Sequence, residues 1–244
     1  MSNFNKICVG LITSCSKQYG ERSKAILETW GKDLKNIYFF TDCSVDNYRY
    51  LNLTNNSKMS SNKEKMMKGI LALYDMNLDC DYYLLGDDDN YFFIKNILKF
   101  CNNDINKNEL AFYGRDIYNW KIGFFNNARA MNQRTHSAGD TLEYCGGGGM
   151  LLNVRSFKKM AEYTKNNYNK IMNRFPMYAD VCMGYICKYS SIKFIPEDRF
   201  HTDCYLTFRD EEYREAKLKS YLENQFSFHY IIDKDQCNFL EEYK

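Results

Sequence analysis

Three short apolar runs separated by helical patterns place the strongest limit on the fold of this chain. ICVGLIT (7–13), IYFFTD (37–42) and CDYYLLGDDD (80–89) are rich in β-branched and aromatic residues, which indicates three buried strands. The segments between and after them, SKQYGERSKAILETW, SNKEKMMKGILALYDMN and FFIKNILKFC, carry apolar residues at helical spacing. Strands that alternate with helices are typical of an α/β fold with a mostly parallel central sheet flanked by helices, and this is the predicted fold class.

Polar residues stand at the end of each predicted strand. They are Thr13 and Ser14, Asp42, and the consecutive aspartates Asp87, Asp88 and Asp89. Parallel α/β sheets bind ligands at the carboxyl ends of their strands, so these side chains are expected to meet there. The sequence therefore predicts a ligand site at this edge of the sheet.

Three adjacent carboxylates between YYLL and YFFI repel one another unless something offsets the repulsion. A solvated acidic turn is the simplest interpretation of such a run, but the apolar residues on both sides argue against it. A divalent cation would turn the repulsion into coordination, and oxygen ligands favour magnesium or manganese over zinc. A metal-dependent nucleotide hydrolase or nucleotidyltransferase stays open at this point. The absence of GxxxxGK[ST], and of GxGxxG after the first strand, disfavours a kinase or a dehydrogenase.

The composition argues against two other classes of protein. The formal net charge is +2 and no long basic run occurs, which disfavours a general nucleic-acid-binding protein. The longest apolar windows are too short to span a bilayer, so no transmembrane segment is predicted. No linker rich in Pro, Gly or Ser divides the chain, and residues 1–244 are expected to form a single domain.

The ten cysteines form no CxxC pair and no zinc-like spacing. Cys8, Cys80, Cys182 and Cys187 sit among apolar residues and are interpreted as small buried thiols. Reduced cysteines are the default expectation, although the even count leaves a few disulfides possible.

Beyond these observations, several segments resemble one known family. A hydrophobic strand that ends in DDD before an aromatic-rich helix is similar to the metal-binding motif of GT-A glycosyltransferases. ILETWGKDLKNIYFFTD, YCGGGGMLLNVRSFKKM, ADVCMGYICK and FSFHYI resemble further blocks of glycosyltransferase family 31, in particular of its Fringe and core-1 galactosyltransferase branches. The resemblance covers about residues 7–235. It implies the Rossmann-like GT-A fold and a nucleotide sugar as donor substrate.

The resemblance also implies a metal site and a donor site. Asp89 and His229, together with Asp87, would hold Mn²⁺ or Mg²⁺, and Asp87 and Asp88 would contact the ribose, the metal waters or the donor sugar. The other residues expected at the UDP-sugar are Thr13, Ser14, Asp42, Lys65, Gly147 and Gly148. Taken alone, these residues have ordinary alternatives: a strand-end turn, a solvated helix lysine, a flexible glycine loop, and a core histidine in the case of His229.

Asp180, in the segment ADVCMGYICK, is the general base that the resemblance implies. In an inverting transfer, a carboxylate accepts the proton of the acceptor hydroxyl as that hydroxyl attacks the anomeric carbon. The alternative is that Asp180 caps the helix VCMGYICK, and both roles can hold at once. Ala179 stands where many relatives carry a second acid, which is a departure from the family pattern. His201 is expected to be structural or to lie on the acceptor side.

The predicted function is therefore inverting, metal-dependent transfer of a hexose of the galactose or N-acetylglucosamine type from a UDP-sugar. The acceptor would be a hydroxyl of a glycan, glycoprotein or glycolipid, and the resemblance makes a β1,3 linkage the expected product. The alternative is a catalytically silent Fringe-like protein that binds sugar or serves as a partner protein. No secretory leader or membrane anchor is evident in the sequence, so a cytoplasmic location is expected.

Overall fold

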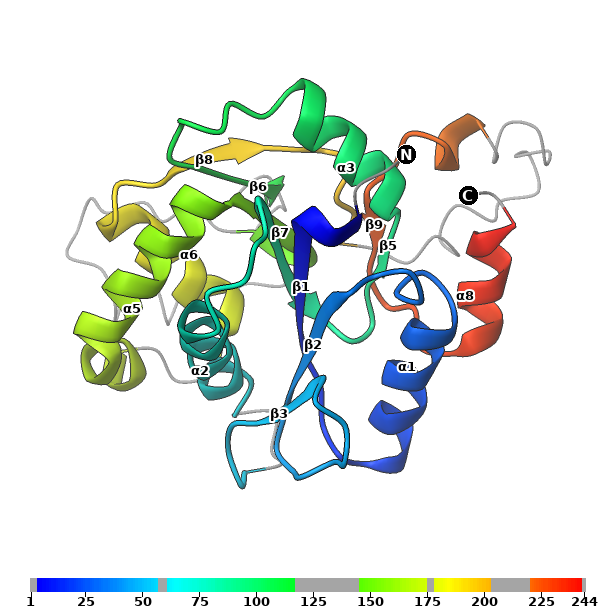
Figure 1. The fold of residues 1–244 in the computed structure, drawn as a ribbon, viewed down its shortest axis with the longest axis horizontal. Coiled ribbons are helices and arrows are strands. Elements are labelled where there is room, and N and C mark those ends of the chain that lie inside the picture. The colour runs from blue at the N-terminus through cyan, green and yellow to red at the C-terminus, as the bar shows by residue number, and fades with distance from the viewer. Residues whose placement is uncertain (1–3, 57–60, 117–144, 175–177, 203–219, 243–244) are drawn as a thin grey trace, which may run out of the picture.

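The computed structural model describes residues 4–56, 61–116, 145–174, 178–202 and 220–242. Within these ranges the chain alternates between strands and helices (Figure 1). In chain order the elements are η1 (Phe4–Lys6), β1 (Ile7–Ile12), α1 (Lys17–Glu28), β2 (Asn36–Thr41), β3 (Tyr50–Asn52), α2 (Asn62–Asp75), β4 (Tyr82–Asp87), β5 (Tyr91–Phe92), α3 (Ile94–Asn103), β6 (Ala111–Asp116), β7 (Cys145–Asn153), α5 (Val154–Arg174), α6 (Ala179–Tyr189), β8 (Lys193–Pro196), β9 (Ser227–Phe228) and α8 (Lys234–Glu241).

A seven-stranded sheet in the order β3-β2-β1-β4-β7-β6-β8 forms the centre of the fold. Strands β3, β2, β1 and β4 run parallel to one another, and β6 runs parallel to β8. Only β7 runs the other way, antiparallel to both β4 and β6. The carboxyl ends of β1, β2 and β4 therefore lie at the same edge of the sheet as the beginning of β7. The predicted α/β fold with a mostly parallel sheet is confirmed.

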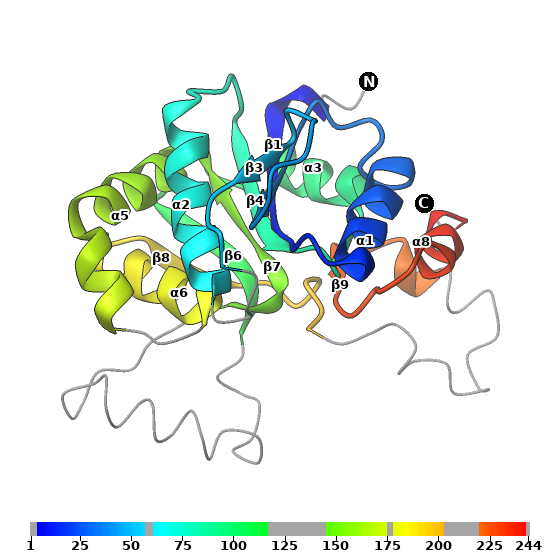
Figure 2. The same ribbon diagram turned by 90° about the horizontal axis from the view of Figure 1, so that it is seen from below.

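Helices cover both faces of this sheet (Figures 1 and 2). Along β1, side chains alternate between two hydrophobic cores, so that Val9 and Leu11 belong to one and Cys8 and Ile12 to the other. The first core packs against α1, α3 and α8, and the second against α2, α5 and α6. None of the helices in the described ranges is long and apolar enough to cross a membrane.

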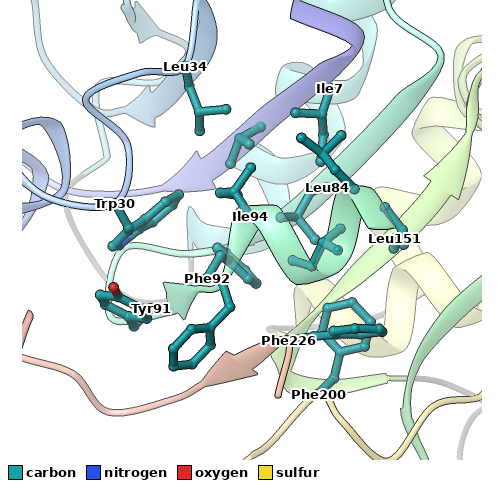
Figure 3. Close-up of a cluster of buried hydrophobic side chains, with 14 of the residues drawn as sticks. Ile7, Trp30, Leu34, Leu84, Tyr91, Phe92, Ile94, Leu151, Phe200 and Phe226 are labelled. Carbon is teal, nitrogen blue, oxygen red and sulfur yellow. The ribbon is translucent and has the colours of Figure 1, made fainter. Parts of the chain in front are cut away.

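One predicted helix begins later than expected because of aromatic packing in the first core. The segment FFIKNILKFC is helical only from Ile94 onward, because Tyr91 and Phe92 form β5, which pairs antiparallel with β9. Both side chains are fully buried, and the ring of Phe92 meets the ring of Trp30 edge-on at a centroid distance of 5.3 Å. Figure 3 shows these rings gathered between the sheet and the helices. Burial against Trp30 therefore holds the start of the segment in an extended conformation.

The expectation of reduced cysteines holds for most described cysteines but is wrong for one pair. Cys8, Cys80, Cys182 and Cys187 are buried free thiols, as expected. Cys15 and Cys43, however, form a disulfide. The two residues follow β1 and β2, which are neighbouring parallel strands, and their Cα atoms lie 6.0 Å apart. Sequence spacing carries no sign of this pairing, because strand adjacency brings the two cysteines together.

Candidate active site

The acidic turn after β4 is held in place by Asn90. The backbone N–H of Asp87 donates to Oδ1 of Asn90 (2.8 Å), and Nδ2 of Asn90 donates to the carbonyl oxygen of Gly147 on β7 (2.6 Å). Asn90 is buried, so the turn is attached to the neighbouring strand and does not swing freely in solvent. The interpretation of the aspartates as a solvated acidic turn is therefore disfavoured.

Asp87, Asp89 and His229 gather at one point beside this turn. One ligand atom of each lies within 4.8 Å of the others. Nε2 of His229 is 3.2 Å from Oδ1 of Asp89, and Nδ1 of the same ring lies 3.2 Å from the carbonyl oxygen of Thr202. In the described part of the chain no hydrogen bond reaches this buried Asp89 oxygen, despite the short distance to His229. Two carboxylates and an imidazole fit a divalent cation, which would satisfy that oxygen.

Burial and mutual charge shift the pKa values of the residues in this cluster. Burial and the negative charge of Asp89 raise the pKa of Asp87. Burial by itself would lower the pKa of His229, but Asp89, Asp87 and the Thr202 carbonyl together more than offset this, and the pKa is raised overall. Without a cation the cluster therefore favours holding protons, which a bound divalent ion would displace.

Asp88 points away from this cluster toward β1 and α1. Its Oδ2 accepts a hydrogen bond from Oγ1 of Thr13 (2.6 Å), and its Oδ1 accepts one from Nη1 of Arg22 (3.2 Å). Burial raises the pKa of Asp88 to about 7, although Thr13 and Arg22 both act to lower it. The three aspartates are thus divided, with Asp87 and Asp89 facing His229 and Asp88 bonded to the neighbouring strand and helix.

Asp42 and Lys65 form a buried ion pair at the end of β2. Nζ of Lys65 donates to Oδ2 of Asp42 (2.8 Å) and to the carbonyl oxygen of Thr13 (2.7 Å), and both charged side chains are only 1% exposed. Ser14 Oγ and the Cys15 N–H also donate to Asp42. Burial alone would raise the pKa of Asp42, but the bonds from Lys65, Cys15 and Ser14 lower it. The alternative of a solvated Lys65 is therefore wrong, and its charge partner is Asp42, not the acidic turn.

We expect Lys65→Met to lower the free energy of unfolding by about 3–5 kcal/mol, because it leaves the Asp42 carboxylate buried without its cation. Urea unfolding at pH 7.5 measures the change. The pKa of Asp42 is lowered in the folded state, so this contribution is present above the unfolded pKa and lost as pH falls through the folded value. The deficit should accordingly shrink below about pH 4. Adding Asp42→Asn should restore part of the stability, and a deficit unchanged in the double variant would contradict this explanation.

The glycine run lies inside β7 (Cys145–Asn153), so the alternative of a flexible glycine loop is disfavoured. A Cβ atom on Gly147 would overlap the His229 imidazole, and one on Gly148 would lie 2.6 Å from the carbonyl oxygen of His201. Gly149 has a φ of +103°, a conformation that residues with side chains rarely adopt. The strand is therefore built from glycine so that the segments of His201 and His229 can pack directly on its backbone.

Asp180 lies in the first turn of α6 and lines a cavity of about 370 Å³ together with Asp87, His229 and Gly147. Its Oδ1 accepts a hydrogen bond from the backbone N–H of Val181 (2.8 Å). The N-cap residue of α6 is Tyr178, not Asp180. Asp180 therefore does not cap the helix but accepts a hydrogen bond within its first turn. Burial raises the pKa of Asp180 to about 6, which leaves the carboxylate ionised at neutral pH and more basic than an exposed aspartate.

A second cavity of about 260 Å³ adjoins the first, and Asp87 and His229 line both. Its other polar lining residues include Thr13, Ser14, Arg22, Lys65, Asp88 and Asp89. Of the strand-end residues predicted from the sequence, Thr13, Ser14 and the three aspartates therefore meet at this cavity, whereas Asp42 lines neither cavity and is joined to it through its ion pair with Lys65. One cavity holds the basic side chains, and the other holds the candidate general base.

The sequence model of the Fringe-like family matches residues 3–242. The chain belongs to the Fringe-like family. It is accordingly a glycosyltransferase, built on the α/β fold with the mostly parallel central sheet described above.

Two solved structures are similar to this Fringe-like protein, each with 11% sequence identity. One is a glycosyltransferase involved in the glycosylation of the major capsid of PBCV-1, with a TM-score of 0.48 over 96% of this chain and 99% of that chain. The other is the galactosyltransferase LgtC in complex with donor and acceptor sugar analogs, with a TM-score of 0.45 over 96% of this chain and 95% of that chain. A search of curated proteins found no significant match.

Sequence reasoning missed two residues of the Fringe-like site, Arg22 and Asn90. Nη1 of Arg22 lies 3.2 Å from Asp88 and 4.0 Å from Asp89, so this side chain supplies positive charge to the acidic turn. A polar residue on the solvent side of a helical pattern gives no sign of such burial. For Asn90 a signal existed, because Asn after a run of carboxylates is a common turn residue that bonds nearby backbone.

His201 is a packing residue of the Fringe-like fold. Its Nε2 lies 2.6 Å from Oε1 of Gln225, and its ring stacks on that of Phe228 at a centroid distance of 4.8 Å. It lines neither of the two cavities described above. These contacts favour the structural interpretation of His201 over a place on the acceptor side.

Proposed function

We propose that the protein is an inverting, metal-dependent glycosyltransferase that moves a hexose from a UDP-sugar to an acceptor hydroxyl. The observation that carries the proposal is that Asp87, Asp89 and His229 converge beside the same cavity as Asp180. In such a reaction the leaving diphosphate needs positive charge and the attacking hydroxyl needs a base. A cation-binding cluster that is separate from a buried carboxylate supplies both. Galactose and N-acetylglucosamine are the expected donor hexoses, and β1,3 is the expected linkage.

Asp87, Asp89 and His229 would hold the metal ion, with Mn²⁺ or Mg²⁺ as the best match to their oxygen and nitrogen atoms. When bound there, the ion supplies positive charge that stabilises the departing diphosphate. Arg22 lies next to the same aspartates, and Lys65, Thr13 and Ser14 line the smaller cavity. We assign the UDP moiety to this smaller cavity because Arg22 supplies a cationic side chain there that suits phosphate oxygens, whereas the Lys65 ammonium is already paired with Asp42.

Asp180 would act as the general base on the acceptor side. Its carboxylate lies in the larger cavity, is ionised at neutral pH and is kept in position by the Val181 N–H. Accepting the proton of the acceptor hydroxyl as the new bond forms would raise the nucleophilicity of that oxygen. The hydroxyl would belong to a glycan, glycoprotein or glycolipid.

A catalytically silent Fringe-like protein that binds sugar or serves as a partner is the alternative. A silent relative has no need for a metal-binding cluster or for a buried base whose pKa is raised. This chain keeps Asp89, His229 and Asp180, and the three side chains line the two adjoining cavities. Their retention favours activity.

The proposal is tested by measuring UDP release from a panel of UDP-hexoses with Mn²⁺, with Mg²⁺ and with EDTA. We expect release from at least one UDP-sugar of the galactose or N-acetylglucosamine type, and its loss in EDTA. Restoration by excess Mn²⁺ is the control for damage by the chelator. Release from no donor, or release that EDTA leaves unchanged, would refute metal-dependent transfer.

A further inference from the structure

The disulfide between Cys15 and Cys43 lies within reach of solvent. Cys15 is exposed and Cys43 is half-buried, whereas the six free cysteines that the structure describes are all buried. A buried thiol is shielded from reagents in solution, but an exposed disulfide can be attacked by a thiolate. Among the cysteines whose side chains are described, this pair is therefore the one that a reductant in solution can reach.

The disulfide joins the loops that follow β1 and β2, two strands that lie side by side in the central sheet (Figure 1). Both loops meet at Asp42. The N–H of Cys15 donates to Oδ1 of Asp42 (2.9 Å), and the hydroxyl of Ser14 donates to Oδ2 (3.0 Å). Cys43 is the next residue along the chain after Asp42. The covalent link therefore holds the loop after β1 against the Asp42 carboxylate.

Lys65 connects Asp42 to the smaller cavity. Its Nζ donates to Oδ2 of Asp42 (2.8 Å) and to the carbonyl oxygen of Thr13 (2.7 Å). Oγ1 of Thr13 in turn donates to Oδ2 of Asp88 (2.6 Å). Thr13, Ser14 and Lys65 all line the smaller cavity. A shift of the loop after β1 would therefore move side chains in the wall of this cavity.

We propose that Cys15–Cys43 is a reversible redox site that sets the affinity of the protein for the UDP-sugar. This inference rests on the proposed function, which assigns UDP to the smaller cavity. The reductant is a dithiol. One of its thiolates attacks Sγ of the exposed Cys15, which forms a mixed disulfide and releases the thiolate of Cys43. The second thiolate of the reductant then displaces Cys15, so that the protein gains two electrons and two protons while the dithiol becomes a disulfide.

Reduction removes the covalent link between the two loops. Ser14 and Cys15 can still bond to Asp42, but those bonds must then form against the greater conformational freedom of unlinked loops. In the oxidised form the loop after β1 is ordered before the ligand arrives, whereas in the reduced form UDP has to order it on binding. The oxidised protein is therefore the form that binds UDP tightly.

The redox site is tested by calorimetric titration of oxidised and reduced wild-type protein with UDP in Mn²⁺. The reduced protein is prepared with dithiothreitol, which is removed by desalting under argon because it binds metal ions. Mass spectrometry of alkylated peptides reports the state of Cys15 and Cys43. We expect reduction to raise the Kd for UDP about tenfold, and reoxidation with oxidised dithiothreitol to restore it.

Two further measurements separate this effect from a general loss of structure. The Kd for Mn²⁺ alone should change less than twofold on reduction, because Asn90 attaches the acidic turn to β7 and not to these loops. Loss of the disulfide should lower the melting temperature by about 10 °C, so the titrations are made at about 15 °C, where the reduced protein stays folded. A Kd for Mn²⁺ that rises as much as that for UDP would overturn the assignment.

The control variant is Cys15→Ser/Cys43→Ser. It should bind UDP as weakly as the reduced wild type and respond neither to dithiothreitol nor to its oxidised form. A response in this variant would place the effect at another cysteine and overturn the assignment. Equal Kd values for UDP in the two forms of the wild type would also overturn it but leave the proposed function standing, since the disulfide would then be a structural link only. Binding of UDP by neither form would remove the proposed function as well.

Discussion

Asp180→Asn is expected to lower kcat for glycosyl transfer by about 10³-fold, with donor binding unchanged. The amide keeps the size of the carboxylate, and its oxygen can still accept the hydrogen bond from the Val181 N–H (2.8 Å). What is lost is the ability to take the proton of the acceptor hydroxyl. Initial rates at saturating acceptor, together with calorimetric titration of UDP in Mn²⁺, separate the chemical step from binding.

The pH dependence of the wild-type enzyme provides an independent check. Because the base must be ionised, kcat should fall as pH decreases through the Asp180 pKa of about 6. The folded-state pKa is raised, so the folded protein binds this proton more tightly than the unfolded chain does, and stability decreases as pH rises from about 4 to 6. Asp180→Asn removes that penalty and should unfold at the same temperature as the wild type or higher at pH 7.5.

Asp235→Asn is the matched control, because Asp235 also lies in the first turn of a helix, α8, but is exposed. It should leave kcat unchanged. If Asp180→Asn keeps full transfer activity, Asp180 is not the base. If Asp235→Asn loses as much activity, the loss in the first variant does not arise from proton transfer.

The convergence of polar strand ends was predictable because it depends on topology alone. Parallel neighbours bring their carboxyl ends to one edge, so Thr13, Asp42 and Asp87 had to approach one another once the strand-helix alternation was recognised. The hydrogen-bond and ion-pair partners of these strand-end residues were not predictable. Lys65 lies on one face of α2, and only the packing of that helix over β1 and β2 turns it from a solvated lysine into the buried partner of Asp42.

The place of His229 could not be derived from local pattern. The resemblance to family 31 indicated the residue, but the structure explains how a histidine so late in the chain reaches the acidic turn. Phe228 pairs with Tyr91 in the small β5-β9 sheet, and this pairing brings the next residue, His229, beside Asp89. Tyr91 lies in the aromatic run that was expected to form a helix, and its pairing requires a long-range contact that no window of sequence contains.

The glycine run of β7 indicates that a group approaches the backbone closely, but it does not indicate which group. Four consecutive glycines indicate that another group comes close to the backbone. The group expected beside Gly147 and Gly148 was the UDP-sugar, whereas the structure places the His229 ring against Gly147 and the His201 backbone against Gly148. Close packing of protein on protein thus accounts for these two glycines, and Gly147 still lines the cavity of Asp180.

Asp89→Asn is expected to raise the Kd for Mn²⁺ at least about 100-fold and to lower UDP release about 10³-fold. The substitution keeps the shape of the side chain but removes its negative charge. Nε2 of His229 lies 3.2 Å from Oδ1 of Asp89, so the imidazole also loses the charge that raises its pKa. Calorimetry with Mn²⁺ alone, and the rise in melting temperature on adding Mn²⁺, measure binding without reliance on activity.

His201→Gln tests whether this loss belongs to the cluster or to any histidine near β9. His201 stacks on Phe228 and bonds Gln225, so its replacement should lower the melting temperature while leaving the Kd for Mn²⁺ within about twofold of the wild type.

His229→Gln should instead weaken Mn²⁺ binding as Asp89→Asn does. Wild-type affinity for Mn²⁺ in both Asp89→Asn and His229→Gln would show that the ion binds elsewhere. The buried Asp89 oxygen, to which no described residue donates a hydrogen bond, would then need another explanation.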